Sequence, residues 1–161
     1  MARLKQKYES NGFFGIGALH IADEENLGTL MRSAFILGAS FIFTADKKYK
    51  PSSNDVTKAW SKIPLYHYES FDNLLKNIPH STQLVGVELS EEATPIGDFE
   101  HPTRAIYLLG SENVGLPPKV LNRCHSQLVL PGNFSLNLAV AGSIVAHHRY
   151  QQLGGILPKR G

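Results

Sequence analysis

Cysteine is almost absent from this sequence: Cys124 is the only one in 161 residues. A single cysteine cannot close an internal disulfide and cannot form a cysteine cluster around a metal ion, so neither device stabilises the fold. A lone thiol is typical of proteins that are kept in a reducing compartment. We therefore expect a soluble, cytoplasmic protein.

Long apolar stretches are absent as well. None approaches the roughly 20 residues that a helix needs to span a bilayer. The run from Phe13 to Ala22 follows three basic residues, as the core of a secretion signal would. It contains His20, however, and leads into acidic residues without a small-residue cleavage pattern. A buried strand explains this run better, and we expect neither a membrane span nor a signal peptide.

An excess of one charge is also missing. The 16 basic and 14 acidic residues leave a formal net charge of +2 at pH 7. Such a balance permits contact with nucleic acid but does not argue for it. The hydrophobic share of 42% is that of an ordinary globular protein. The length suggests a single domain over residues 1–161 with one substantial core.

Short apolar runs alternate with helical patterns along the chain. This alternation is typical of an α/β fold with a mostly parallel sheet flanked by helices. The expected strands are 15–22, 41–44, 65–68, 84–89, 105–109 and 128–130. The expected helices are 26–38, 71–77, a short one that begins near residue 117, and 135–150. Asn26 and Ser135 are expected to cap the first and last helices, and the acidic stretch around Pro95 is expected to be irregular.

The first motif, residues 26–33 (NLGTLMRS), starts where the first strand meets the first helix. Side chains at such a junction project at the carboxyl edge of the sheet, where open α/β folds bind ligands. Gly28 allows a backbone or ligand to approach closely, and Arg32 carries a fork of donors suited to a phosphate. Taken alone, the motif is explained more simply by Asn26 as a helix cap and Arg32 as a surface charge.

The second motif, residues 108–117 (LLGSENVGLP), ends a predicted strand in a glycine-bounded loop. It is not a P-loop, because the Lys-Ser/Thr ending is missing. Glu112 is unsuited to a phosphate but can orient a hydroxyl, an amide or an arginine. An ordinary turn with an exposed glutamate explains this motif equally well.

The third motif, residues 130–142 (LPGNFSLNLAVAG), leads into the last predicted helix. Small residues such as Ala139 and Gly142 allow another segment to pack very closely against this helix. Ser135 is explained by capping alone. Asn137 is a poor helix former without an evident capping role, so we expect its side chain to point at a ligand.

In this order and spacing, the three motifs resemble those of the TrmH/SpoU family of SPOUT-class RNA 2′-O-methyltransferases. The family pattern is an Asn-x-Gly-x-x-x-Arg helix start, a Gly-x-Glu-x-x-Gly-Leu loop, and Ser-Leu-Asn after an apolar-Pro strand end. All three occur here, and the resemblance covers residues 18–150. It implies an α/β fold whose C-terminal part forms a trefoil knot, which topology rules alone would not suggest.

The resemblance also implies an activity, namely methyl transfer from S-adenosyl-L-methionine to a ribose 2′-hydroxyl in RNA. We expect tRNA more than rRNA as the substrate, because no separate RNA-binding domain is evident. Arg32 matches the catalytic arginine, and a charge-assisted pair with Glu112 would hold it. The positions that orient the substrate or hold the arginine are Asn26, Glu112, Ser135 and Asn137. The positions that contact the methyl donor are Leu109, Gly110, Leu130 and Leu136.

No metal ion is implied, and we interpret the pair His147-His148 as a solvated helix end. Family members are typically homodimers, and Val140 and Ile144 could serve either the core or the dimer interface. The RNA contacts are expected at Arg3, Lys5, Lys7, residues 47–62, Lys159 and Arg160. Any one of these charges taken singly is better explained as a solvated surface residue, whereas together they could hold the RNA backbone.

Two other functions stay open on the sequence. A non-catalytic RNA-binding protein could retain the knotted fold, although the intact motif residues argue against it. A dinucleotide-dependent oxidoreductase is suggested only by the α/β alternation. Its G-x-G-x-x-G fingerprint is not matched, because Gly12, Gly15 and Gly17 are misordered and do not follow a strand.

Overall fold

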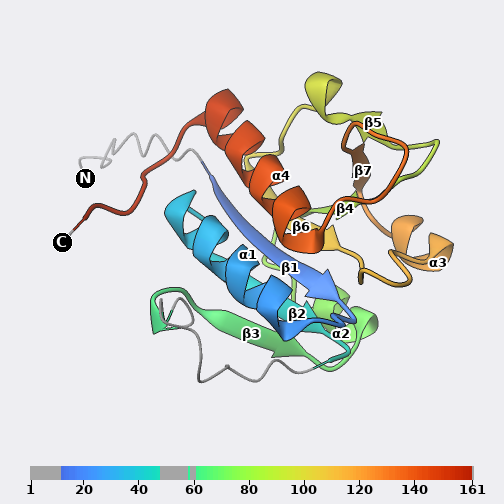
Figure 1. Ribbon diagram of the computed structural model, residues 1–161, viewed down its shortest axis with the longest axis horizontal. Helices are drawn as coiled ribbons and strands as arrows, with labels where there is room; N and C mark the ends of the chain where they lie inside the picture. The colour runs from blue at the N-terminus through green and yellow to red at the C-terminus, as the bar shows by residue number, and fades with distance from the viewer. Residues whose placement is uncertain (1–11, 48–57, 59–60, 161) are drawn as a thin grey trace, which may run out of the picture.

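A computed structural model describes residues 12–47, 58 and 61–160. Their strands form one seven-stranded sheet in the order β3-β2-β1-β6-β4-β7-β5, and every neighbouring pair is parallel. Helices lie on both faces of this sheet (Figure 1). The predicted α/β fold with a mostly parallel sheet is confirmed.

The strands agree with the predicted runs except near their ends and at one place. Their bounds are β1 (Phe13–Leu19), β2 (Phe41–Ala45), β3 (Leu65–Tyr68), β4 (Gln83–Val87), β5 (Thr94–Pro95), β6 (Arg104–Leu109) and β7 (Ser126–Val129). The prediction of an irregular stretch around Pro95 is wrong at β5, which pairs with β7. A two-residue strand has no room for an alternating pattern, so the sequence carries no signal for it.

The helices divide into two layers. Their bounds are α1 (Glu24–Ile36), α2 (Phe71–Lys76), α3 (Pro118–Leu121) and α4 (Leu138–Leu153), with a 3-10 turn, η2 (Ile96–Asp98). Helices α1 and α4 pack against each other on one face of the sheet, as Figure 1 shows. Buried Leu74 of α2 and Val120 of α3 belong to a second apolar cluster on the opposite face.

Both helix caps differ from the predicted ones. Helix α1 begins earlier, because the Asp23 side chain accepts a hydrogen bond from the backbone N–H of Glu25. Helix α4 begins later, because the Asn137 side chain accepts from the backbone N–H groups of Ala139 and Val140. The predictions that Asn26 and Ser135 are caps are therefore wrong. Both side chains are left available for other contacts.

Glycines allow close packing at two places in this fold. Gly17 lies inside β1, where an added Cβ would stand 2.0 Å from the carbonyl oxygen of Phe43 on β2. Gly142 lies inside α4, where an added Cβ would stand 2.3 Å from Cδ1 of Leu30 on α1. The expected close packing of the small-residue helix is thus observed. The glycine in β1 makes room for a neighbouring strand and does not form a dinucleotide-binding turn.

The C-terminal part of the chain returns across the sheet. After β7, which lies between β4 and β5, the chain runs back to place α4 beside α1 (Figure 1). The trefoil knot stays a prediction, because strand order and register do not define how the loops thread. No helix in the described ranges has the length and apolarity to cross a membrane.

Candidate functional site

A cavity of about 220 Å³ opens at the carboxyl ends of β4, β6 and β7. The residues that line it come mostly from three segments, 87–89, 109–115 and 130–138. The four residues that were predicted to contact the methyl donor all line the cavity: Leu109, Gly110, Leu130 and Leu136. Residues far apart in the sequence therefore meet where α/β sheets bind their ligands.

The loop after β6 is held in shape by one buried serine. Ser111 is only 6% exposed, and its carbonyl accepts a hydrogen bond from the N–H of Gly115 at 2.9 Å. Its hydroxyl accepts from the N–H of Val114 at 3.2 Å. Gly115 has a φ of +69°, a left-handed conformation that favours glycine. The second motif is thus a tight, pre-shaped wall of the cavity.

Glu88 braces the same loop from the end of β4, and its role was missed in the sequence. Its carboxylate accepts hydrogen bonds from the N–H of Leu116 at 2.7 Å and from the N–H of Leu89 at 2.9 Å. An added Cβ on Gly115 would stand 2.5 Å from the carboxylate. The only signal in the sequence was a charged residue within a predicted strand. That signal becomes informative once the strand is known to end at Val87.

The loop between β7 and α4 leaves its own backbone polar groups free. Residues 132–136 form no backbone hydrogen bond with the rest of the chain that the structure describes. Unpaired N–H and C=O groups at a cavity are available to a ligand. Apolar side chains of Val87, Leu109 and Leu138 complete the lining. The cavity therefore combines an apolar lining with backbone polar groups that a ligand could bond.

A chain of side-chain hydrogen bonds joins all three motifs beside this cavity. The Asn26 side-chain amide donates to a carboxylate oxygen of Glu112 at 2.6 Å. The Asn137 amide donates to the Asn26 side-chain oxygen at 2.8 Å, while the Asn137 oxygen caps α4. Glu112 also lines the cavity, as does Ser135. Four of the five predicted catalytic residues thus lie at or beside the site.

Arg32 is the exception. It is exposed on α1 and forms no hydrogen bond or ion pair with the described part of the chain. The expected pair between Glu112 and Arg32 is therefore not formed within one chain, because Glu112 is bonded to Asn26 instead. Arg32 lies six residues beyond Asn26, roughly 9 Å further along the helix. Its guanidinium is left open to an external partner.

Comparison with known proteins agrees with the three motifs. The family model described as the SpoU rRNA Methylase family matches residues 15–147. The chain belongs to this SpoU family. The match contains all the residues around the cavity and the whole hydrogen-bonded chain through Asn26.

Curated and solved relatives of this SpoU chain are also found. The 23S rRNA (guanosine-2′-O-)-methyltransferase RlmB of Acinetobacter baylyi is 26% identical over 141 residues, which is 82% of this chain and 57% of the relative. A solved structure described as structural insights into the 2-OH methylation of C/U34 on tRNA has a TM-score of 0.77 and 26% identity. It covers 89% of this chain and 97% of the other.

A third relative supports the fold of this SpoU chain. The AdoMet-bound rRNA methyltransferase of Sinorhizobium meliloti has a TM-score of 0.76 at 24% identity, over 88% of this chain and 57% of that one. The chain therefore spans little more than half the length of this structure and of the Acinetobacter relative.

A buried polar cluster lies at the far end of α4 in this SpoU domain. The ring nitrogens of His101 contact the Tyr107 hydroxyl at 2.6 Å and His148 at 2.8 Å. Buried Arg149 donates to the same hydroxyl at 3.1 Å. The reading of His147-His148 as a solvated helix end is thus wrong for the second histidine. Burial, followed by the charges of His148 and Arg149, lowers the pKa of His101 to about 4.

Two further groups bear on the chemistry. Burial raises the pKa of the Cys124 thiol to about 11, which makes this side chain a poor nucleophile at neutral pH. Among the described residues, no three His, Cys, Asp or Glu side chains are grouped so as to hold a metal ion.

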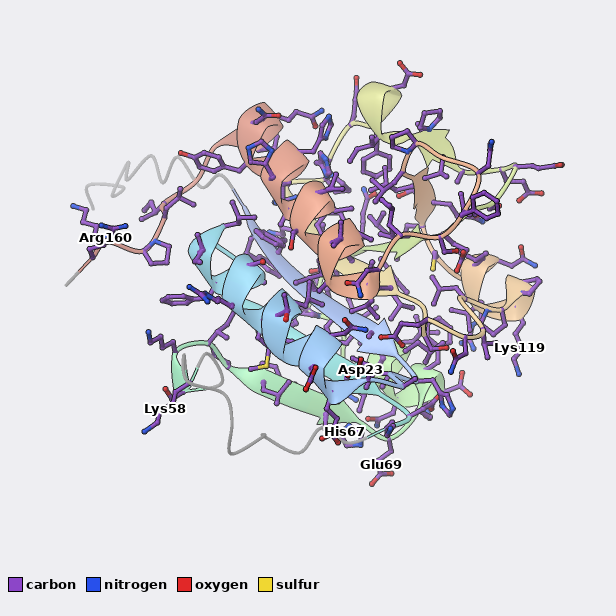
Figure 2. The ribbon with its side chains drawn as sticks, in the orientation of Figure 1. Asp23, Lys58, His67, Glu69, Lys119 and Arg160 are labelled. Carbon is purple, nitrogen blue, oxygen red and sulfur yellow. The ribbon has the colours of Figure 1, made fainter. Side chains whose placement is uncertain are left out.

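The residues predicted to contact RNA are only partly described. Arg3, Lys5, Lys7 and most of residues 47–62 lie outside the described ranges. Lys58 and Arg160 are exposed, and Figure 2 shows both on one side of the view, with Lys119 of α3 on the other.

Proposed function

We propose that this chain methylates a ribose 2′-hydroxyl of RNA with S-adenosyl-L-methionine as the methyl donor, and that its substrate is tRNA. The observation that carries the proposal is the convergence of three family motifs on one cavity at the carboxyl edge of the sheet. Relatives named for 2′-O-methylation of 23S rRNA guanosine and for 2-OH methylation of C/U34 on tRNA support the reaction class.

The cavity fits the proposed donor. Leu109, Gly110, Leu130 and Leu136 would hold it, and the unbonded backbone of residues 134–136 would be available to its polar groups. When bound, the donor supplies a methyl group on a positively charged sulfur, together with a good leaving group. The protein's own task is then to position the ribose hydroxyl in line with that methyl group.

Arg32 is proposed to act on the hydroxyl. An arginine side chain stays protonated at neutral pH, so it cannot itself take up the hydroxyl proton. Its guanidinium can hold an RNA phosphate, which accepts the proton, and can stabilise the negative charge that develops on the oxygen. The chain through Asn26, Glu112 and Asn137 keeps the start of α1 in register with the cavity.

We also propose that the protein acts as a homodimer. Ile36, Val140 and Ile144 expose 50%, 48% and 38% of their surface. They belong to the two helices that pack together on one face, and Arg32 is exposed on the same α1 helix. Covering these apolar side chains with a second copy would remove them from water. It would also give the unpaired Arg32 a neighbouring surface.

Methyl transfer from labelled donor to bulk tRNA and to rRNA, followed by mapping of methylated riboses, tests the proposal. We expect Arg32→Ala to reduce transfer by at least about a hundredfold, as for a lost transition-state contact, with donor affinity unchanged. Arg104→Ala, which removes an exposed arginine from the start of β6, is the matched control. Donor binding without transfer to either RNA pool would contradict the activity.

Calorimetry with S-adenosyl-L-methionine addresses the alternative of a non-catalytic RNA-binding protein. Such a protein has no need of a donor site. Saturable donor binding that Gly110→Val abolishes is expected, because an added Cβ at Gly110 already stands 2.3 Å from the carbonyl carbon of Gly115. No binding by the wild-type chain would favour the non-catalytic function.

A further inference from the structure

A second cavity lies on the sheet face that α2 and α3 cover. Its volume is about 490 Å³, within the roughly 300–1,000 Å³ that is typical of small-ligand sites. Its wall includes His20 after β1, Asp46 after β2, and Lys119 and Arg123 near α3. None of these residues belongs to the donor cavity described above.

This second cavity occupies the topological switch point of the sheet. β1 and β6 are neighbours, but the chain leaves β1 toward β2 on one side and leaves β6 toward β7 on the other. Open α/β sheets bind ligands in the crevice outside the carboxyl ends of two such strands. Leu19 at the end of β1 and Ser111 after β6 both line the cavity. Its position is therefore that of a ligand site.

The two cavities share a wall. Ser111, Val114 and Gly115 line both of them, so the loop after β6 separates the donor cavity from the second one. A ligand that extends over this loop can occupy both sites at once. A polynucleotide is such a ligand, because consecutive nucleotides carry the same groups at regular spacing.

The side chains of the second cavity carry both signs of charge. Arg123 forms an ion pair with Asp72 and lies over the Phe71 ring, 5.5 Å from its centroid. The hydrogen bond and charge of Arg123 keep the pKa of Asp72 low, so that this carboxylate stays ionised. Exposed Lys119 forms no ion pair in the described part of the chain. The charge of Lys119 also helps to lower the pKa of Asp72, so its ammonium group lies in a site that presents carboxylates.

The strand ends that line the cavity have unusual backbone conformations. His20 has a φ of +57° and Asp46 a φ of +70°, although neither is glycine. Both are held by the neighbouring strand, since their N–H groups donate to the carbonyls of Ala45 and Tyr68. Residues other than glycine that have a positive φ are found at functional sites more often than elsewhere. Here two of them turn adjacent strands at the mouth of one cavity.

We propose that the second cavity binds a nucleotide of the RNA substrate next to the methylated one. Lys119 holds its phosphate, and Asp46 accepts hydrogen bonds from N–H donors of its base. A lone phosphate suits the site less, because it offers no N–H donor to the Asp46 carboxylate, whereas a nucleotide base does. A free mononucleotide offers the same chemistry as the RNA. The inference rests on the proposed function, because it takes RNA as the substrate.

Affinity for fluorescently labelled bulk tRNA, measured over a range of salt concentrations with the donor-loaded full chain, tests the inference. Lys119→Ala should raise the Kd about threefold to tenfold and lower the slope of log affinity against log salt by about 0.7–0.9, the value for one lost phosphate contact. Lys119→Glu should weaken binding further. Arg104→Ala and Arg104→Glu remove the same charge from the start of β6, outside the cavity, and should leave both quantities unchanged.

Two measurements distinguish this inference from the proposed methyl transfer and from binding of a free nucleotide. In the transfer assay, Lys119→Ala should raise the KM for RNA and leave kcat and donor affinity within a factor of two. Should the wild-type chain transfer no methyl group, the proposed function fails while the tRNA affinities still decide the inference. An unchanged salt slope in Lys119→Ala, or equal effects of the Arg104 variants, would overturn it. So would tight binding of free AMP or GMP that depends on Lys119 while RNA affinity does not.

Discussion

Asn137 offers a sharp test of the site because its side chain has two separable roles. The oxygen caps α4 by accepting from the N–H groups of Ala139 and Val140, and the amide nitrogen donates to Asn26. Asn137→Ala removes both roles. Asn137→Asp keeps an oxygen for the cap but has no N–H to donate to Asn26. The two variants therefore separate the stability of α4 from the polar chain that leads to Glu112.

The expected magnitudes follow from these contacts. Loss of a helix cap costs about 1 kcal/mol, and loss of an exposed hydrogen bond about 0.5 kcal/mol. Asn137→Ala should therefore unfold with about 1.5 kcal/mol less free energy, which lowers Tm by roughly 3–6 °C for a domain of this size. Asn137→Asp should lose no more than about 0.5 kcal/mol, because a carboxylate at a helix N-terminus is stabilised by the helix dipole.

Urea unfolding followed by circular dichroism measures these differences, and the methyl-transfer assay measures the second role. Asn137→Asp should remain folded yet lose most of its transfer, because the carboxylate would face the acceptor oxygen of Asn26. Asn122→Asp introduces the same charge after α3, outside both cavities, and serves as the control. Equal loss of stability in Asn137→Asp and Asn137→Ala would refute the assignment of the cap. Full activity in Asn137→Asp would refute the role of the polar chain.

Three further outcomes are expected. Glu88→Gln should weaken donor affinity roughly tenfold, since an amide has one oxygen for the two N–H groups that Glu88 now satisfies; calorimetry that shows unchanged affinity would contradict this. Gly142→Ala should destabilise the fold by about 1–3 kcal/mol in urea, because its Cβ would overlap Leu30; a more stable variant would disprove the tight packing. Because the pKa of His101 is about 4 in the folded protein and the usual value for histidine is 6.5, the unfolded chain binds the extra proton first as pH falls. The contribution of His101 to the free energy of unfolding should be fully present above pH 6.5 and should fall by up to about 1.4 kcal/mol per pH unit toward pH 4. The variant His101→Gln should flatten that slope.

Much of the fold could be read from local pattern. The apolar runs of β2 and β6 and the periodic pattern of α1 appear in the sequence because these two strands are buried almost throughout and α1 buries one face. The caps were misplaced because Asp23, Asn26, Ser135 and Asn137 are all good cap residues. Which of them caps the helix depends on where the chain leaves the preceding strand and turns into the helix.

The candidate site, too, was predicted only in part from the sequence. The motifs themselves belong to the sequence, and so does the family resemblance that assigns them to a methyl-donor site. Only the tertiary structure pairs Glu112 with Asn26 rather than with Arg32, and only it shows Glu88 bracing the loop. It alone brings Lys119 and Asp46 to one cavity. Hydrogen bonds between residues some 90 positions apart are decided by strand order and register, which no local spacing encodes.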